Sequence, residues 1–507
     1  MNKLVNYVKI QRFYFSLQTF YGMFFIVWHL LNKEAIMKQI DWLAEVNKRK
    51  DDFIADLQGL LQIKSVLDEE NATKDAPLGE GVKEALMYML DLGKKDGFET
   101  KNVENIAGHL QFGAGAESIG ILCHVDVVPE GDGWTSDPYR GEIRDGRIYA
   151  RGALDDKGPT MAAYYAMKIV KELQIPLSKE IRMIIGTDEE SQWRCVDTYF
   201  KQESMPTMGF APDADFPIIY AEKGIADFDI VQVQEDTVEE KSAQLFVSSF
   251  SSGRRYNMVP DFASARLDAE NEQEVMKHFK EYLVENNIAG RCFMENDEIV
   301  LEADGISAHG LEPDNGVNAG LKLAAFLAEL KLDKKAASFF NLLSDYFTEE
   351  SRGRKLGIAY HDEITGDLTL NVGKLHYTKE SGGRLGLTMR YPVTTDMEKT
   401  KSKLDALLES SGFCIENFSN SKPHYVEKDS ELIQTLKKVY EEQTGEKAEL
   451  ISIGGGTYAR SLEKGVAFGP LFPGREDIAH QKDEYMILDD LIKAAAIYAQ
   501  AIYELAQ

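Results

Sequence analysis

Residues 118–129 read SIGILCHVDVVP, in which an apolar run leads into His124 and Asp126. A run of this length is typical of a buried strand, and functional residues of α/β sheets gather where such strands end. Residues 158–173 (GPTMAAYYAMKIVKEL) show helical patterning, and residues 180–191 (EIRMIIGTDEES) form a second apolar run that ends in acidic residues. This alternation predicts an α/β sheet covered by helices between residues 37 and 225.

The pattern changes twice further along the chain. From about residue 226 the chain reads as strands punctuated by helices, and after Pro423 the first pattern resumes, with a helix at 430–443 and a strand at 448–453. A chain of 507 residues is also too long for one ordinary domain. We therefore predict an α/β main domain that carries an inserted α+β domain. The predicted segments are 37–225 and 424–507 for the main domain and 226–423 for the insertion.

Residues 1–36 differ in composition from the rest of the chain. Their apolar run at residues 20–31 is shorter than the about 20 residues that a membrane helix needs. One amphipathic helix is expected to begin near Met37. We interpret Met37 as the native start and residues 1–36 as an extension, and a membrane-anchored scaffold would depend on that extension alone.

Composition excludes several classes of function. The chain has 57 basic and 84 acidic residues and a formal net charge of −27. Sequence-independent binding of nucleic acid needs the opposite sign, and an anionic membrane would repel residues 37–507. No C-x-x-C pair occurs, which argues against a thiolate metal site, and the spacing of the cysteines argues against a disulfide framework and for the cytoplasm. The cysteines are Cys123, Cys195, Cys292 and Cys414.

Histidines and carboxylates that could bind a metal stand at the ends of five apolar runs. Singly, each is explained as a strand end, a helix cap, a turn or a surface loop. Together they all fall in the two parts of the predicted main domain, which favours one shared site. In a strand, Asp126 would share a face with His124 and could orient it, and an extended segment would point Glu189 and Glu190 apart. The groups are His124 with Asp126, Asp155 with Asp156, Asp188-Glu189-Glu190, Asp213, and His480.

Nine motifs occur in a fixed order between residues 118 and 485. They are GILCHVDVVPEGDGW, GRIYARGALDDKGP, IIGTDEESQWRCVDTYF, GFAPDADFPIIYAEKG, RYNMVP, GISAHG, LTMRYP, SIGGGTYAR and GREDIAHQKDEY. This series resembles the cocatalytic zinc metallopeptidase family of aminoacylases, desuccinylases, glutamate carboxypeptidases and carnosinases. Within the family it is most similar to the bacterial PepV-type, or Xaa-His, dipeptidases. The resemblance implies a zinc-exopeptidase-like catalytic domain with an inserted lid.

The resemblance also implies two Zn²⁺ per chain, with Mn²⁺ or Co²⁺ as substitutes. A hydroxide held by both ions would attack the peptide bond of an unblocked dipeptide. Asp126 would orient His124, and Glu189 would be the general base, a role typically worth about 10²–10⁴-fold in rate. The implied ligands are His124, Asp155 and Asp213 for one ion and Asp155, Glu190 and His480 for the other, with Asp155 bridging.

For the lid, the resemblance implies three residues that act on the substrate. His309 would stabilise the oxyanion, Asn257 would donate a hydrogen bond, and Arg390 would bind the terminal carboxylate through its planar fork. Because a large lid supplies His309 within the same chain, we expect an active monomer. A substrate-facing loop is implied at Gly455, Gly456 and Thr457.

Two alternatives to a dipeptidase stay open from the sequence. One is another amide hydrolase of the family, namely an N-acyl amino-acid deacylase, a desuccinylase or a carboxypeptidase, because the ligand set is shared. The other is a non-catalytic two-domain protein that closes around a peptide. Glu189 argues against the second, because a pure binding protein has no use for a general base.

Overall fold

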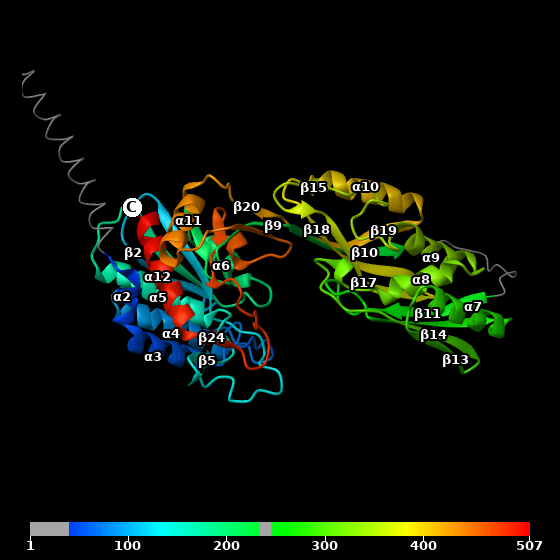
Figure 1. Cartoon of the computed structure of the whole chain (residues 1–507), viewed down its shortest axis with the longest axis horizontal. Helices are drawn as coiled ribbons and strands as arrows, with labels where there is room; N and C mark the ends of the chain where they lie inside the picture. Colours follow the sequence, from blue (N-terminus) through cyan, green and yellow to red (C-terminus); the bar gives the residue numbers. More distant parts are fainter. Residues whose placement is uncertain (1–39, 234–244) are drawn as a thin grey trace, which may run out of the picture. The chain divides into compact units, whose positions relative to one another are not determined.

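The computed structural model describes residues 40–233 and 245–507 (Figure 1). The predictions for residues 1–36 lie outside this part of the chain. The described residues divide into two compact units, one of residues 40–204, 442–445 and 476–507, and one of residues 205–233, 245–441 and 446–475. We call them unit 1 and unit 2 and describe each separately. The predicted mixed α/β class is confirmed.

Unit 1 is built on two neighbouring parallel strands that are almost entirely buried. They are β3 (Ser118–His124) and β6 (Glu180–Gly186), and their register pairs His124 with Gly186. Because parallel strands end at the same edge, His124 and the acidic residues after Gly186 meet there. Antiparallel strands continue this part of the sheet in the order β1-β2-β6-β3, with β1 at Glu99–Val103 and β2 at Ala107–Phe112.

Two long helices of unit 1 pack against each other. They are α5 (Lys157–Glu172) and α12 (Leu488–Leu505), and both are rich in buried alanine, which allows close approach. The helix predicted at residues 158–173 is confirmed as α5. The remaining helices of unit 1 are α2 (Trp42–Asn47), α3 (Lys50–Leu61), α4 (Glu80–Lys95) and α6 (Arg194–Gln202).

The single helix expected after Met37 is wrong in the described part of that segment. The chain forms two helices there, α2 and α3, with a break at Arg49, whose backbone leaves helical geometry at φ −114° and ψ 9°. The Arg49 side chain donates to the Glu45 carbonyl at 2.7 Å and to Glu172 Oε2 at 2.8 Å. The break therefore coincides with an ion pair that ties this turn to α5.

A small antiparallel sheet joins two distant segments of unit 1. Its order is β24-β5-β4, with β24 at Tyr485–Ile487, β5 at Arg147–Tyr149 and β4 at Glu142–Arg144. Tyr485 pairs with Tyr149. This pairing brings the segment that carries His480 beside the segment that carries Asp155.

Unit 2 contains an antiparallel sheet of eight strands in the order β13-β14-β12-β11-β17-β18-β10-β19. Residues of this sheet share one hydrophobic core with helices α7 to α10. Its strands lie between Gly224 and Ser421. The assignment of 226–423 as an inserted lid stays a prediction. The strands are β10 (Gly224–Gln232), β11 (Leu245–Ser252), β12 (Phe262–Ala269), β13 (Gly290–Glu295), β14 (Glu298–Asp304), β17 (Thr369–Thr378), β18 (Gly382–Tyr391) and β19 (Phe413–Ser421), and the helices are α7 (Glu272–Glu285), α8 (Ala319–Ala328), α9 (Lys334–Tyr346) and α10 (Met397–Ser410).

A second group of strands in unit 2 follows the order β7-β22-β9-β20, with β21 beside β9. The helix predicted at 430–443 is α11 (Glu431–Thr444), and the strand predicted at 448–453 is β21 (Leu450–Ile453). The other strands of this group are β7 (Met208–Ala211), β9 (Ile218–Glu222), β20 (His424–Tyr425) and β22 (Gly465–Ala467).

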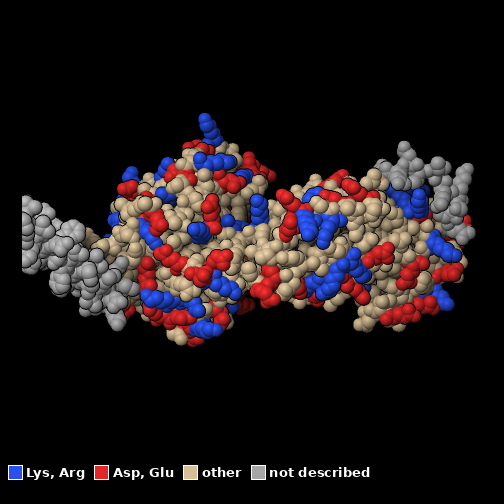
Figure 2. All heavy atoms as spheres, turned by 90° about the horizontal axis from the view of Figure 1, so that it is seen from above, with Lys and Arg blue, Asp and Glu red and all other residues tan. Residues whose placement is uncertain are grey.

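On the face drawn in Figure 2, acidic and basic side chains lie side by side. Within the described residues, none of the helices has the length and apolar content that crossing a bilayer requires.

Candidate metal centre

His124 ends β3 and is completely buried. Its backbone N–H donates to Asp156 Oδ2 at 3.1 Å, and its carbonyl accepts from Thr160 Oγ1 at 3.1 Å. Both partners lie at the start of α5, so the helix fixes the end of the strand. The ring is oriented by its Nδ1, which lies 3.1 Å from the Asp126 carbonyl oxygen, and Nε2 is left to face Asp155.

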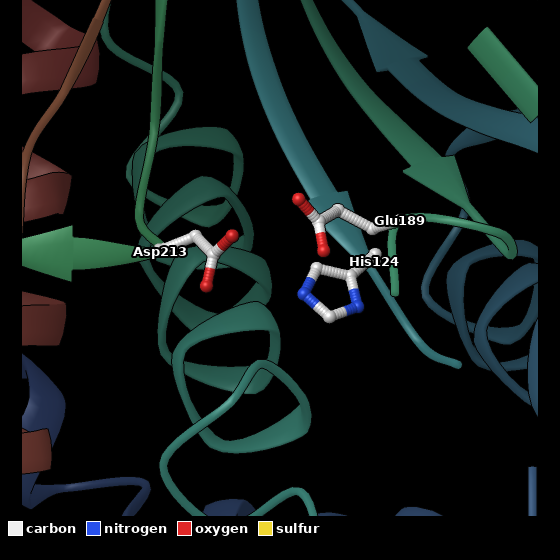
Figure 3. A group of neighbouring side chains, drawn as sticks. All are labelled: His124, Glu189 and Asp213. Carbon is white, nitrogen blue, oxygen red and sulfur yellow. The ribbon is translucent and has the colours of Figure 1, made fainter. Parts of the chain in front are cut away.

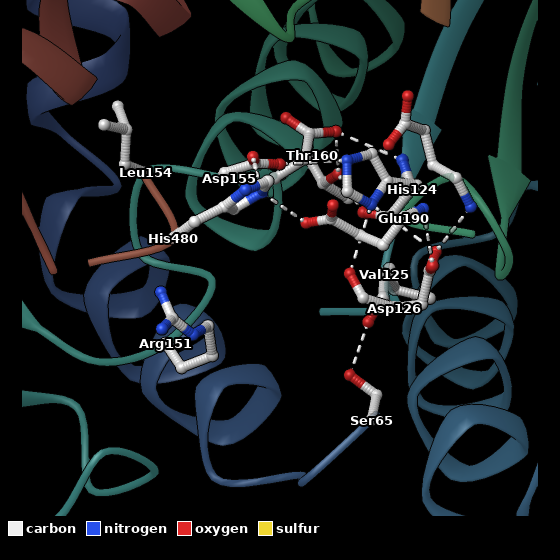
Figure 4. Close-up of polar contacts among 12 residues, drawn as sticks. Ser65, His124, Val125, Asp126, Arg151, Leu154, Asp155, Thr160, Glu190 and His480 are labelled. Atoms are coloured by element: carbon white, nitrogen blue, oxygen red, sulfur yellow. Dashed lines mark hydrogen bonds and ion pairs between the residues drawn. The ribbon is translucent and has the colours of Figure 1, made fainter. Parts of the chain in front are cut away.

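Asp155 lies between two histidines and directs one oxygen to each (Figure 4). Its Oδ1 is 3.1 Å from His124 Nε2, and its Oδ2 is 3.0 Å from His480 Nε2. Although burial works against ionisation, hydrogen bonds from the two rings hold the pKa of Asp155 below its usual range. The residue therefore has the position that a bridging carboxylate requires.

His480 faces two carboxylates with one ring nitrogen. Its Nε2 lies 3.0 Å from Asp155 Oδ2 and 3.0 Å from Glu190 Oε1. Hydrogen bonds that the ring donates to these two carboxylates raise the pKa of His480 to about 10, and burial raises the pKa of Glu190. One proton on one nitrogen cannot serve two acceptors equally, whereas a cation between the three groups would.

Asp126 has a role that its spacing from His124 did not predict. Its carboxylate accepts the backbone N–H groups of Glu189 at 3.2 Å and Glu190 at 3.1 Å. The same carboxylate is 3.5 Å from His124 Nδ1. Asp126 therefore fixes the turn that presents both glutamates, in addition to its contact with the histidine.

Glu189 and Glu190 lie in a turn, so the expected extended segment is wrong. Asp188 shapes this turn, because its buried carboxylate accepts from the Arg194 backbone N–H at 2.9 Å and pairs with Arg194 Nε at 2.7 Å. The two glutamates join different groups of side chains. Glu190 groups with Asp155 and His480.

The other group consists of His124, Glu189 and Asp213, whose ligand atoms lie within 4.8 Å of one another (Figure 3). All five predicted ligands thus occur in the two groups. Glu189, expected as a general base, takes the place in this group that the resemblance gave to Asp155. The ligand and base assignments stay predictions.

The donor sets fit divalent metal ions. Metal–ligand bonds of about 2.0–2.1 Å in a tetrahedral site place ligand atoms about 3.3 Å apart. The distances of 3.0 Å from His480 Nε2 to Asp155 Oδ2 and Glu190 Oε1 are close to this spacing. Imidazole and carboxylate are also the ligands that catalytic zinc sites use. Asp155, Glu190 and His480 would hold one ion, with Asp155 reaching towards a second beside His124.

Three residues predicted to contact substrate lie in unit 2. Met258, next to Asn257, forms an isolated bridge with His309, and the Asn257 carbonyl accepts the Gly310 N–H at 2.7 Å. Arg390 lies on β18, is buried, and its Nε has no hydrogen-bond partner among the described residues. Their action on a substrate stays a prediction.

The glycine loop before Thr457 is also in unit 2. Thr457 donates its N–H to Glu222 Oε2 at 3.1 Å and its hydroxyl to Glu222 Oε1. Arg460 Nε pairs with the same Glu222 Oε2 at 3.1 Å. A side chain at Gly456 would meet the Arg460 guanidinium, with an added Cβ 2.7 Å from Nη1, whereas one at Gly455 would meet nothing. The buried carboxylate of Glu222 thus holds this loop in place, and the sequence analysis did not identify that residue.

Comparison with known proteins identifies the family. Residues 120–504 match the model of peptidase family M20/M25/M40. The chain is 54% identical over 468 residues to "Putative dipeptidase YtjP" of Bacillus subtilis, covering 92% of this chain and 100% of that protein. It is 48% identical over 467 residues to a "Putative dipeptidase" of Staphylococcus epidermidis, covering 92% of this chain and 99% of that one.

Solved structures share the fold at low sequence identity. The aminoacylhistidine dipeptidase of Vibrio alginolyticus has a TM-score of 0.54 at 14% identity and covers 89% of this chain and 97% of its own. The aminopeptidase PepT of Bacillus cereus has a TM-score of 0.54 at 16% identity, with 90% and 99% covered. The resemblance predicted from the motifs is confirmed, and the chain belongs to peptidase family M20/M25/M40 and is a hydrolase that acts on peptide bonds.

Proposed function

We propose that the chain is a dipeptidase that binds two divalent metal ions, Zn²⁺ first among them, and hydrolyses unblocked dipeptides. The observation that carries the proposal is the position of Asp155, with one carboxylate oxygen 3.1 Å from His124 and the other 3.0 Å from His480. The relatives described as dipeptidases support the substrate class.

The metal ions would lower the pKa of a water molecule and polarise the peptide carbonyl. The chain's own residues would do the remaining work. Asp155, Glu190 and His480 would hold one ion, and His124 and Asp213 would hold the other together with Asp155. Glu189, presented by the turn that Asp126 fixes, would accept a proton from the attacking water and return it to the leaving amine.

His309 suits the predicted role in oxyanion stabilisation. Its Nδ1 accepts the backbone N–H of Leu311 at 3.1 Å, so the proton of the neutral ring sits on Nε2, which can donate. Burial, followed by the charge of Arg390, lowers the pKa of His309 and favours that neutral ring. Asn257 would bind the substrate beside it.

Arg390 suits recognition of a carboxylate. It is a buried guanidinium, and burial lowers its pKa, so an anionic partner would compensate the cost of its charge. A free C-terminal carboxylate is such a partner, and its recognition would select short substrates with that group. The backbone of the bound substrate would lie along the loop formed by Gly455, Gly456 and Thr457.

We also propose an active monomer in the cytoplasm. The family resemblance supports the monomer, because it implies a large lid that supplies His309 within the same chain. Within the described residues none of the four cysteines forms a disulfide, which agrees with a reducing compartment.

Substrate cleavage tests the proposed function. Initial rates are measured on a panel of unblocked dipeptides, their N-acetylated forms and the matching tripeptides, before and after treatment with a chelator. We expect cleavage of the unblocked dipeptides alone, loss of this activity after chelation, and recovery with Zn²⁺, Mn²⁺ or Co²⁺. Preferred cleavage of the N-acetylated forms would instead identify a deacylase.

A further inference from the structure

A fully buried ion pair contacts the backbone that carries Asp155 of the candidate metal centre. Arg151 and Glu484 are 1% and 0% exposed, and Arg151 Nη1 lies 2.6 Å from Glu484 Oε2. Removing two charges from water is unfavourable, and their attraction compensates for this only when further hydrogen bonds complete the network. The further hydrogen bonds of this pair are made to backbone groups near Asp155 and in the loop after β3.

Glu484 uses its second oxygen to hold the backbone at Asp155. Oε1 accepts the N–H groups of Leu154 at 2.8 Å and Asp155 at 3.2 Å. Arg151 in turn donates through Nη2 to the carbonyls of Pro129 at 3.4 Å and Glu130 at 3.2 Å. The pair therefore fixes the peptide that carries Asp155 against the loop that follows β3.

The position of Glu484 along the chain connects it to His480 as well. Tyr485 pairs with Tyr149 in β24 and β5, and the Ala150 N–H continues the contact to the Glu484 carbonyl at 3.1 Å. Among the described residues, this is the last backbone hydrogen bond between the two strands. From Ala150 the chain continues forward to Asp155, and Glu484 is preceded by the segment that carries His480. Glu484 thus stands where the two segments that supply facing metal ligands diverge.

We propose that Glu484, held by Arg151, is a positioning residue that sets Asp155 relative to His480 and so determines the affinity of the metal centre. This inference rests on the proposed two-metal function. Neither side chain contacts the substrate or a metal in this account, so both act through Asp155. Outer residues that orient ligands typically contribute 10–100-fold to metal affinity.

The test is a competition titration with Zn²⁺ on the full chain after its metal has been stripped by a chelator. Glu484→Gln keeps the size of the side chain and one acceptor oxygen but removes the charge. Arg151→Lys keeps the charge but removes the planar guanidinium that binds Glu484 and the two carbonyls together. Arg182→Lys is the matched control, because Arg182 is also buried in unit 1 and pairs with Glu180 at 2.6 Å. Melting curves of the stripped proteins report folding separately.

We expect Zn²⁺ to bind about 10–100-fold more weakly to Glu484→Gln and Arg151→Lys, and unchanged to Arg182→Lys. Unchanged Zn²⁺ affinity of a folded Glu484→Gln overturns the inference, and so does an equal loss in Arg182→Lys. If Glu484→Gln does not fold, Arg151→Lys decides by the same criterion. A wild-type chain that binds no divalent metal contradicts the proposed function itself, which distinguishes the two failures.

Discussion

Asp155 Oδ2 lies 3.0 Å from His480 Nε2, although the two residues stand far apart in the sequence. The other oxygen of the same carboxylate lies 3.1 Å from His124 Nε2. A single side chain thus connects the end of β3 with the loop before β24. The proposed chemistry depends on this geometry, because a carboxylate shared by two ions brings them close enough to act on one water and one carbonyl.

Glu189→Gln tests the general base. We expect turnover of a dipeptide to fall about 10²–10⁴-fold, because the carboxylate that accepts the proton is gone. The bound metal, measured by elemental analysis, should stay at the wild-type level.

Metal content matters here because Glu189 groups with His124 and Asp213 in the structure. Loss of one ion from Glu189→Gln would contradict the base assignment and make Glu189 a ligand. Glu69→Gln, which changes a carboxylate that pairs with Arg194 at the surface, is a control for general changes in charge.

Asp126→Ala tests the turn that carries both glutamates. The Asp126 carboxylate accepts the N–H groups of Glu189 and Glu190, so its loss should displace a base and a ligand together. We expect both turnover and metal affinity to fall, the latter about 10–100-fold. Asp126→Asn keeps one acceptor oxygen and should recover part of both, and equal losses in the two variants would argue against this role.

Arg390→Met tests recognition of the substrate carboxylate. We expect KM for unblocked dipeptides to rise by about 10-fold or more, since a hydrogen bond to a charged group is worth about 1.5–3 kcal/mol. For the same dipeptides with an amidated C-terminus, KM of Arg390→Met should differ little from KM of the wild type. An equal rise in KM for free and amidated forms would remove Arg390 from this role.

Acid should destabilise unit 1 through His109, a buried residue of β2 whose Nδ1 lies 2.7 Å from the Tyr199 hydroxyl. Burial, with a smaller effect of the Arg182 charge, lowers the pKa of His109 to about 4. In the unfolded chain the pKa is about 6.5, so between these values the unfolded state binds the extra proton. Stability is therefore fully present above pH about 6.5 and is lost as the pH falls to about 4.

The measurement is urea unfolding of metal-stripped protein at neutral and acid pH. A pKa difference of this size corresponds to about 3 kcal/mol of unfolding free energy. His109→Gln does not titrate, so it should lose about that much less than wild type on acidification. The same acid sensitivity in both proteins would show that His109 is not the group responsible.

The sequence predicted the parts of the site that follow from local pattern. β3 and β6 are apolar runs, and polar residues at their ends had to meet once the strands paired in parallel. Helix α5 was likewise evident from its periodicity. The conformation of the Glu189-Glu190 turn was not, because Asp126 and Asp188 determine it through contacts with backbone N–H groups.

Long-range pairs are what the sequence could not reveal. The contact of β24 with β5 joins two strands of three residues each, too short for a periodic signal. Arg151 and Glu484 lie inside motifs that were recognised, but nothing local indicates that they pair. The helical break at Arg49 has the same origin, since its partner Glu172 lies on another helix.

The stoichiometry of metal binding tests the central claim most directly. Chelator-stripped protein is titrated with Zn²⁺ while bound metal and dipeptide cleavage are followed in the same samples, with Asp155→Ala alongside. Two ions per wild-type chain, activity that returns as they bind, and no activity in Asp155→Ala are the predicted result. Full activity of the stripped chain, or two tightly bound ions in an active Asp155→Ala, would contradict the account.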